Sequence, residues 1–429
     1  MPDSAPSRRT LVRRWWGEAR TSFLWMVAIA LVLRFGYIAI AHTYKLKTVE
    51  DNFDFGWEMG RIGRALADGE GFSSPFMGST GPTAWEPPLY PFLIAAVFRA
   101  FGIYSRTSAL VLLGINSVFS AITCVPIFLI GKRSFSERVA VWTAWTWALL
   151  PPVIFWCTRW VWETSLAALL LAVIFWVTLV MEEAKDGRMW PGFGLLWGVA
   201  ALLNPSLLSF LPASGLWVWW RRIRLGQRSL GGIAVAAVMF VACIAPWLFR
   251  NYRVFRQPIF IRSNFGAELR LGNGPGATGL WMEYLHPTKN AAQMQLYREL
   301  GEMAYVAERR RQAMAFIRED YVRFAGLCLK RFIYYWGGLP HSPDESRLAP
   351  VANSLFLTSS LLAFWGLGRA IRKRRPGAWL FFWLVLCYPL VYYLVFPHPR
   401  YRHPIEPELL ILMVYVVSEV EPSRSHNNP

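Results

Sequence analysis

Long apolar runs, repeated along the chain and separated by short basic loops, constrain its fold more than any other feature. Many of them approach the length of roughly 20 residues that an α-helix needs to cross the hydrocarbon core of a bilayer. The chain has 429 residues and 55% of them are hydrophobic. A soluble chain of this length would form two or more domains with far fewer apolar runs. We therefore predict an all-α polytopic membrane protein.

The pattern predicts about ten transmembrane helices. The run at 190–220 is too long for one helix and Asn204-Pro205 interrupts it, so two short helices are expected to meet there at an external turn. Residues 89–101 are apolar but too few to cross, which indicates a half-inserted helix. The other spans are expected near residues 22–42, 107–130, 139–156, 164–181, 229–249, 352–370, 377–396 and 405–418.

The formal net charge of +18 would also suit a protein that binds nucleic acid. Lys and Arg instead cluster in short loops between apolar runs, such as 132–133 and 372–375, which is the positive-inside pattern. Membrane topology therefore explains the charge, and nucleic acid is not an expected partner. The same rule places the basic loops in the cytoplasm and the loop that begins at residue 43 outside.

This topology divides the chain into three expected parts. Residues 1–249 form a transmembrane module whose first external loop, 43–106, carries the catalytic residues. Residues 250–349 form an external segment, and residues 350–429 form C-terminal transmembrane helices. Within the external segment, residues 250–279 are expected to be loop or strand, and residues 290 to about 336 are helical by pattern.

The first external loop is predicted to hold a helix at 55–67 that ends at Gly69. Apolar residues one turn apart share one face of this helix, namely Met59, Ile62 and Leu66. The charged residues are expected to turn away from that face, namely Glu58, Arg61 and Arg64. This pattern is typical of a helix that lies on the membrane surface rather than across it.

Three carboxylates on external segments, Asp54, Glu86 and Glu163, are the candidates for catalysis. An acidic residue at membrane depth is a functional candidate by default. Asp54 could act as a general base that deprotonates an acceptor hydroxyl or amine beside a lipid phosphate. Structural alternatives remain open, because Asp54 could instead cap the helix that follows it. Glu86 could likewise be an exposed acid at a helix start, before Pro87-Pro88.

Glu163 shares an external turn with Arg159, which is a candidate for substrate binding. The two could instead form an interfacial salt bridge that contributes little to stability. Three carboxylates on three outward-facing segments are harder to explain together as structural residues than singly.

The loop before the last span holds Arg400, Tyr401 and Arg402, which are predicted to bind substrate. Because arginine can hold two phosphate oxygens at once, we expect the two arginines to clamp a lipid phosphate at the outer interface. The alternative is a basic cytoplasmic loop, which would require one fewer crossing upstream. Arg262 and Asn264 in the external segment are two further candidates for substrate binding.

In order and spacing these motifs resemble the GT-C glycosyltransferases, specifically the family 39 group. That group includes protein O-mannosyltransferases and the lipid A aminoarabinose transferase. The resemblance rests on an acidic residue before a helix that ends at Gly69, on Glu86-Pro87-Pro88-Leu89 before an apolar helix, and on Arg159 followed by Glu163. The loop at 400–402 adds to it.

The resemblance implies a GT-C-type bundle with Asp54 as the catalytic base and with Glu86 and Glu163 as supporting acids. The chain departs from the family at three places. Phe55 follows Asp54 where the family often has Asp-Glu, Glu163 stands where Asp is usual, and the Lys expected near residues 204–205 is missing. These departures leave the acceptor and any bound metal open.

The expected function is a glycosyltransferase that moves a sugar from an isoprenoid-phosphate-linked donor to a lipid, glycan or protein acceptor. The expected location is the bacterial inner membrane, with the site on the periplasmic face. A divalent metal is left open and no nucleotide is expected. The alternatives are a flippase for lipid-linked saccharides or a catalytically inactive GT-C-like subunit. A transporter would spread its functional residues through the spans, whereas the acids here gather on external loops.

Overall fold

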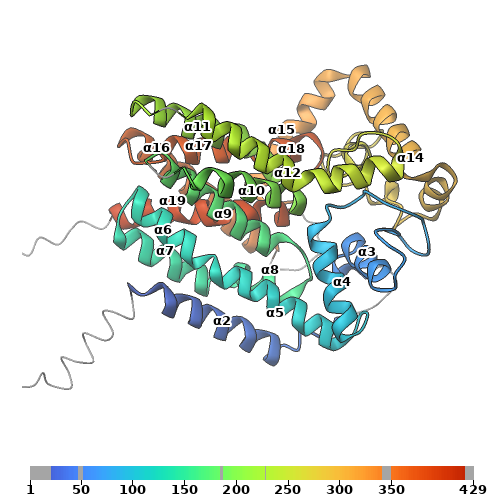
Figure 1. Ribbon diagram of the computed structural model, residues 1–429, viewed down its shortest axis with the longest axis horizontal. Coiled ribbons are helices and arrows are strands. Elements are labelled where there is room, and N and C mark those ends of the chain that lie inside the picture. The colour runs from blue at the N-terminus through green and yellow to red at the C-terminus, as the bar shows by residue number, and fades with distance from the viewer. Residues whose placement is uncertain (1–20, 47–51, 184–186, 228, 341–348, 421–429) are drawn as a thin grey trace, which may run out of the picture.

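The computed structural model describes residues 21–46, 52–183, 187–227, 229–340 and 349–420. Within these ranges the chain is helical without a β-strand, and one isolated bridge joins Ser73 to Pro82. The predicted all-α class is therefore confirmed. Most helices run along the long axis of the molecule, and four others gather at one end of it (Figure 1), namely α3 (Glu58–Ala67), α4 (Leu89–Phe101), α13 (Phe265–Gly272) and α14 (Ala291–Glu319).

Among the described residues, five helices are long and apolar enough to cross a membrane, or six if one bent pair counts as a span. The five are Phe23–Ile40 (α2), Arg106–Ser134 (α5 and α6), Thr164–Met181 (α9), Leu230–Phe255 (α12) and Pro350–Arg372 (within α16, Ala349–Arg372). The shorter apolar helices are Leu89–Phe101, Met189–Leu203 (α10) and Ala378–Leu394 (α17 and α18). The last helix is α19 (Glu406–Val420). The count of ten spans stays a prediction.

Proline determines two of the breaks in the bundle. The predicted break at Asn204 is confirmed, because α10 ends at the residue before it and the chain continues through η2 (Pro205–Phe210) into α11 (Leu211–Arg224). The Asn204 side chain accepts a hydrogen bond of 3.0 Å from the Ser206 amide. A second break was not predicted: α7 (Glu137–Leu149) and α8 (Pro151–Arg159) meet at 47°, since proline cannot continue a helix from within.

The helix predicted at 55–67 begins later than expected. Residues Phe53–Phe55 form a 3-10 turn (η1), and Gly56 follows with a φ of 85°. Because a helix cannot run through this left-handed conformation, α3 starts only at Glu58, and Trp57 occupies the N-cap position. The alternative in which Asp54 caps this helix is therefore not seen. The predicted end is confirmed, since Gly69 has a φ of 85°.

The expected division of α3 into an apolar and an exposed face is also wrong for two residues. Glu58 and Arg61 are 5% and 3% exposed. Arg61 donates to the Pro75 carbonyl (3.3 Å) and to the Thr288 hydroxyl (3.2 Å). The helix is therefore covered by the external segment on the face that was expected to meet water.

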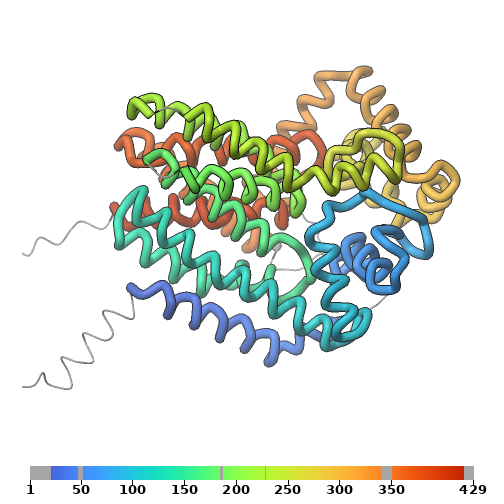
Figure 2. The backbone as a smooth tube through the Cα atoms, in the orientation of Figure 1, coloured from blue at the N-terminus to red at the C-terminus, as the bar shows by residue number. Residues whose placement is uncertain are grey.

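The external segment is more helical than its sequence indicated at 250–279. There, α12 continues to Phe255 and α13 occupies Phe265–Gly272, so helix replaces part of the loop or strand expected at 250–279, and the part boundary expected at 249 falls inside α12. Helix at 290–336 is confirmed by α14, which is kinked at Gly301, and by α15 (Tyr321–Gly337). Figure 2 shows the first external loop and the external segment side by side at one end of the bundle.

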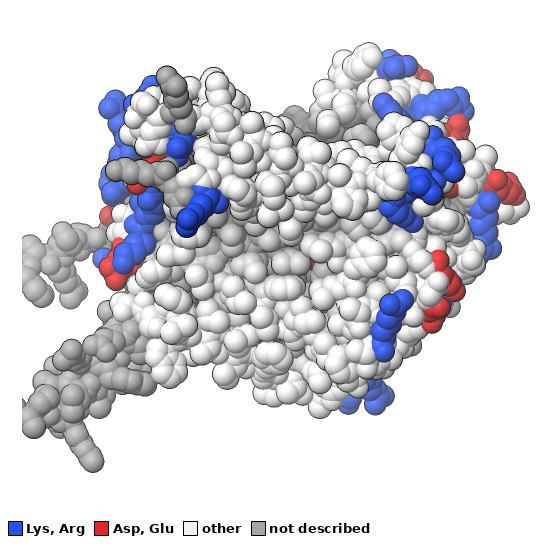
Figure 3. All heavy atoms as spheres, in the orientation of Figure 1, with Lys and Arg blue, Asp and Glu red and all other residues white. Residues whose placement is uncertain are grey.

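Charged side chains gather at the two ends of the molecule, and the broad band between them is uncharged on the face in Figure 3. At the end away from α3 and α14, Glu182 accepts from Arg133 (3.3 Å) and from Arg221 (2.9 Å). This contact joins the ends of α6, α9 and α11, so the basic loops meet at one end, as the positive-inside pattern requires.

Candidate functional site

A cavity of about 590 Å³ lies where the first external loop meets the external segment and the loop before α19. Its wall is rich in aromatic rings, including four tryptophans: Trp57, Trp85, Trp162 and Trp281. A concave, largely apolar pocket with a few convergent polar groups is the usual form of a small-molecule site. Polar groups of this kind are present on several sides of the cavity.

Five glutamates line the cavity, and three of them are left with an unsatisfied oxygen. The five are Glu58, Glu86, Glu163, Glu268 and Glu283. One buried side-chain oxygen on each of the first three lacks a hydrogen-bond partner among the described residues. Because an unpartnered buried acceptor costs free energy, three of them around one cavity indicate that hydrogen-bond donors enter it from a ligand.

The carboxyl of Glu86 is held in an unusual protonation state. Its pKa is raised to about 8, mainly by burial; Arg262 lowers this pKa, and the carboxylates of Glu58, Glu163 and Glu268 raise it. Like charges around a low-dielectric cavity favour the neutral form. Glu86 therefore holds its proton at neutral pH and can donate a hydrogen bond.

His286 is a cavity residue that the sequence did not reveal as one. Its ring stacks on Trp57 at 4.7 Å, and its Nε2 lies 3.3 Å from Oε1 of Glu58, although without hydrogen-bond geometry. Its Nδ1 accepts from the Thr288 amide at 3.2 Å. Since an accepting nitrogen carries no proton, the neutral ring has its proton on Nε2, on the side of Glu58.

Glu58 was also missed as a site residue, but its sequence position held a signal. It stands four residues before Ile62, and residues at that spacing share a face of a helix. Ile62 is completely buried, and Glu58 is buried beside it. A carboxylate on the buried face of a helix is the unusual feature that would have identified it.

Four of the predicted substrate-binding residues line the cavity, namely Arg262, Asn264, Arg400 and Tyr401. Arg262 lies 3.7 Å from the Glu86 carboxylate and donates to the Asn264 side chain at 2.6 Å. The Arg400 guanidinium lies over the Trp162 ring at 3.6 Å, and its buried Nε lacks a hydrogen-bond partner among the described residues. Both guanidinium groups therefore share the cavity with the glutamates named above.

The structure does not bring the remaining predicted residues into the cavity lining. Asp54 is half-buried beside it, and its backbone carbonyl accepts from the Val161 amide at 2.9 Å. Arg159 is exposed and lies over the Phe155 ring at 5.9 Å. Arg402 also lies outside the cavity lining, and its guanidinium contacts α16 instead.

Arg402 is buried and ties its loop to α16. It donates to the hydroxyls of Ser359 and Ser360 at 2.7 Å each, and it lies 2.7 Å from Glu406. The loop at 399–405 is a 3-10 turn (η4) rather than an open chain. Because these contacts point away from the cavity, Arg400 and Arg402 do not form a common clamp in this structure.

A buried carboxylate outside the cavity holds two of its walls together. Glu302 of α14 accepts from the Thr83 hydroxyl, from the Ala84 amide at 2.8 Å and from the Ser263 hydroxyl at 2.7 Å. Tyr297 donates a fourth hydrogen bond at 3.0 Å. Since Ala84 and Ser263 stand close in sequence to Glu86 and Arg262, this carboxylate fixes the loops that carry those two residues.

Arg250 supports the same loop from the other side. Its guanidinium donates to the Thr83 carbonyl at 2.6 Å and to the Phe72 carbonyl at 2.8 Å. Thr83 is therefore held at both its side chain and its backbone. In the part of the chain that the structure describes, no group of three or more His, Cys, Asp or Glu side chains is placed to hold a metal ion.

Comparison with known proteins places this geometry in context. A sequence profile of the dolichyl-phosphate-mannose-protein mannosyltransferase family matches residues 85–249. A search among curated proteins found no significant match. The apo crystal structure of the Archaeoglobus fulgidus oligosaccharyltransferase has a TM-score of 0.51 and 14% identity to this chain. The alignment covers 93% of this chain and 50% of that one, so the chain spans about half the length of that protein.

Two further structures are similar at lower scores. The Archaeoglobus fulgidus oligosaccharyltransferase AglB, in complex with an inhibitory peptide and a dolichol-phosphate, has a TM-score of 0.49 and 13% identity, covering 93% of this chain and 50% of that chain. ArnT from Cupriavidus metallidurans, bound to undecaprenyl phosphate, has a TM-score of 0.38 and 11% identity, covering 92% and 77%. The partial family match and the shared fold confirm the resemblance stated from the sequence, and the chain has the fold of the Archaeoglobus fulgidus oligosaccharyltransferase.

Proposed function

We propose that this protein is an integral membrane glycosyltransferase that moves a sugar from an isoprenoid-phosphate-linked donor to an acceptor outside the membrane. The description of the matched family names dolichyl-phosphate-mannose, which is a lipid-phosphate-linked sugar donor. The similar structures named above were solved with a dolichol-phosphate and with undecaprenyl phosphate. Both findings support a lipid phosphate as the carrier.

One observation carries the proposal: three carboxylates from three separate segments leave unpartnered oxygens in a cavity that also holds two arginines. A sugar offers many hydroxyl donors to such oxygens, and a departing lipid phosphate is an anion that suits the arginines. The tryptophans of the wall add flat apolar surfaces against which a sugar ring can pack. A simple lipid-binding pocket would not need this set of acids.

The reaction would be a single displacement at the anomeric carbon. The acceptor oxygen or nitrogen forms a bond to that carbon while the bond to the phosphate oxygen breaks, and the phosphate leaves with the electron pair. A carboxylate takes the acceptor proton in the same step. Glu58 is the first candidate for this base because it lines the cavity, and Asp54, one residue after the cavity-lining Phe53, is the second.

Arg262 and Arg400 would stabilise the negative charge that develops on the departing phosphate, since cations held in place act most strongly on charge formed in the transition state. Arg400 is the better placed of the two, because its unpartnered Nε is free of the glutamates that occupy Arg262. Glu86 and Glu163 would bind sugar hydroxyls. The three-part division of the chain, the bacterial inner membrane and the periplasmic face of the site belong to the same proposal.

A donor-cleavage assay tests the proposal without knowledge of the acceptor. Purified protein in nanodiscs is given a panel of undecaprenyl-phosphate-linked hexoses and pentoses together with a membrane extract, and release of undecaprenyl phosphate is measured. We expect release with at least one donor, and a loss of at least about 100-fold in Glu58→Gln. Glu299→Gln, which alters an exposed acid of α14, is the matched control.

The same assay separates the alternatives. A transporter would move the intact donor across a vesicle membrane without releasing undecaprenyl phosphate. An inactive subunit would bind donor and leave it intact. If no donor of the panel is cleaved, or if Glu58→Gln and Asp54→Asn both cleave it at the wild-type rate, the proposed chemistry is wrong.

A further inference from the structure

A second groove lies on the side of the bundle, between α7, α16 and α19, and has a volume of about 340 Å³. It shares no lining residue with the cavity of the site. On α7 its wall consists of Arg138, Trp142 and Thr146, which stand four residues apart and so share one face of the helix. Eight residues of helix extend about 12 Å, so the groove runs along the helix axis.

The groove is apolar along its length and open to the surroundings of the bundle. On α19 its wall runs from Leu410 to Val417 and ends at Ser418. Trp142 and Val417 are 55% and 56% exposed. Because α7 and α19 belong to the apolar bundle, this open side faces the acyl chains of the bilayer.

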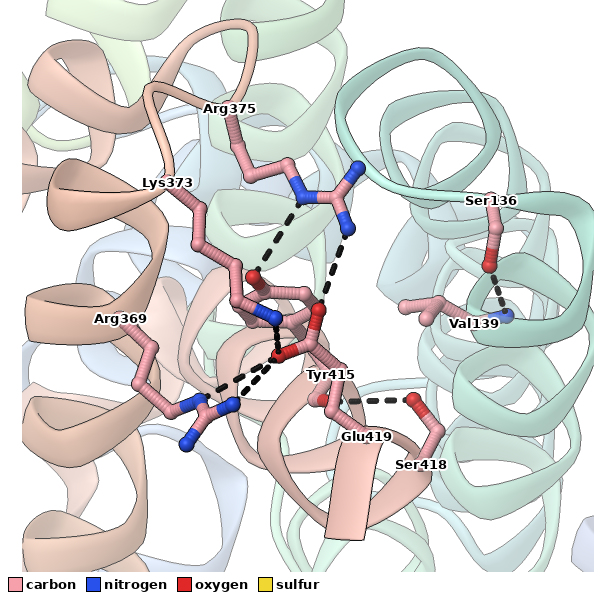
Figure 4. A network of polar contacts seen from close by, with 8 residues as sticks. All are labelled: Ser136, Val139, Arg369, Lys373, Arg375, Tyr415, Ser418 and Glu419. Atoms are coloured by element: carbon pink, nitrogen blue, oxygen red, sulfur yellow. Dashed lines mark hydrogen bonds and ion pairs between the residues drawn. The ribbon is translucent and has the colours of Figure 1, made fainter. Parts of the chain in front are cut away.

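A cluster of cations stands at the end of the groove. Arg369 and Lys373 lie 3.0 and 2.7 Å from the carboxylate of Glu419, the residue after Ser418 of the groove wall. Arg375 lies 3.1 Å from the same carboxylate. Figure 4 shows the three side chains converging on Glu419, with the start of α7 at Ser136 opposite.

Three cations around one carboxylate leave an excess of two positive charges, three minus one. These side chains remain 34%, 47% and 37% exposed. Arg138 of the groove wall adds a further cation at the same end.

We propose that this groove binds an anionic glycerophospholipid from the leaflet that surrounds it. One acyl chain would lie along the apolar wall, and the phosphate would meet Arg138 and Lys373. Basic pockets between transmembrane helices recognise anionic head groups in this way, whereas a zwitterionic head group carries no net charge to attract. The assignment is independent of the glycosyltransferase proposal, because no residue is common to the two sites.

Native mass spectrometry of the full-length protein tests the proposal. The protein is released from detergent in the presence of phosphatidylglycerol, phosphatidylcholine or undecaprenyl phosphate at equal concentration. We expect phosphatidylglycerol to be retained best. The double variant Arg138→Gln/Lys373→Gln should bind it about 25-fold more weakly, since each basic side chain at an anionic surface contributes about fivefold.

Two further variants keep the test decisive. Arg224→Gln removes an exposed cation of α11, another helix with a basic last turn, and should retain the lipid as the wild type does. Thr146→Phe fills the groove without changing charge and should also lose the lipid. An unchanged melting temperature without added lipid establishes that each variant is folded.

Three results would overturn the proposal. Equal retention of phosphatidylcholine and phosphatidylglycerol would show that the cations do not select the head group. Retention unaffected by the double variant or by Thr146→Phe would place the lipid elsewhere. Undecaprenyl phosphate bound more tightly than phosphatidylglycerol, and lost in the same variants, would assign the groove to an isoprenoid lipid instead.

Discussion

Replacing Glu302 by alanine should release the loop that carries Glu86. The carboxylate accepts four hydrogen bonds, from Thr83, Ala84, Ser263 and Tyr297. A hydrogen bond to a charged group contributes about 1.5–3 kcal/mol, and a buried donor left without a partner costs about 1–3 kcal/mol. The three hydroxyls can rotate toward other acceptors, whereas the Ala84 amide cannot.

We therefore count the full cost for the Ala84 amide and a fraction of it for each hydroxyl. The sum is about 4 kcal/mol, in line with the cost of breaking a buried charged network. Because Glu302 holds two loops rather than the bundle, this free energy should appear as local opening of the loop and not as global unfolding.

Hydrogen–deuterium exchange measures that opening directly. A loss of about 4 kcal/mol should speed exchange of the amides at 83–86 by about 10³-fold, while the amides of α9 should exchange at their original rate. Glu299→Ala, on the other side of the kink at Gly301, removes an exposed acid that accepts only from Gln295 among the described contacts and should change nothing. If exchange at 83–86 is the same in both variants, Glu302 does not hold the loop.

Three further predictions concern the cavity and its border. Burial raises the pKa of Glu86 from 4.5 to about 8, so the folded protein holds an extra proton between these values and stability should fall as pH rises through that window; chemical denaturation at a series of pH values between about 5 and 8 should show this slope in wild type and not in Glu86→Gln. His286→Gln keeps a donor near Glu58 while His286→Ala does not, so donor cleavage should fall less in the first variant; equal losses would exclude the pairing. Arg402→Lys should lower the melting temperature, because one ammonium cannot serve two serines and a carboxylate, whereas Arg400→Lys should instead lower donor cleavage without destabilisation; a swap of these outcomes would restore Arg402 to the phosphate site.

Much of the bundle could be predicted from sequence because spans and their breaks are local properties. The helix at Leu89–Phe101 and the span at Thr164–Met181 lie at their predicted positions, and the break at Asn204 follows from the proline after it. The bend before Pro151 was missed because the apolar run continues through it. Hydropathy averaged along the sequence cannot reveal a kink, because the kink does not change the amino-acid composition of the run.

The site could be predicted best where its residues stand on turns between apolar runs. Glu86, Glu163 and Arg400 stood out because charge is rare there. Glu58 was expected to face solvent. The residues that cover it, around His286, lie far away in sequence, so the pattern of residues in α3 gives no sign of them. Arg402 was misplaced for a similar reason, since its serines belong to α16 and no local pattern links them to the loop.

The contact between Thr83 and Glu302 also imposes an order of events on the synthesis of the chain. The two residues are 219 positions apart. At about 5–20 residues per second, the first loop leaves the ribosome about 10–40 s before the carboxylate that holds it. Several apolar helices must be inserted in that interval while the loop carrying Glu86 waits without its partner. The cavity can therefore take its final shape only after α14 has been synthesised, late in the assembly of the protein.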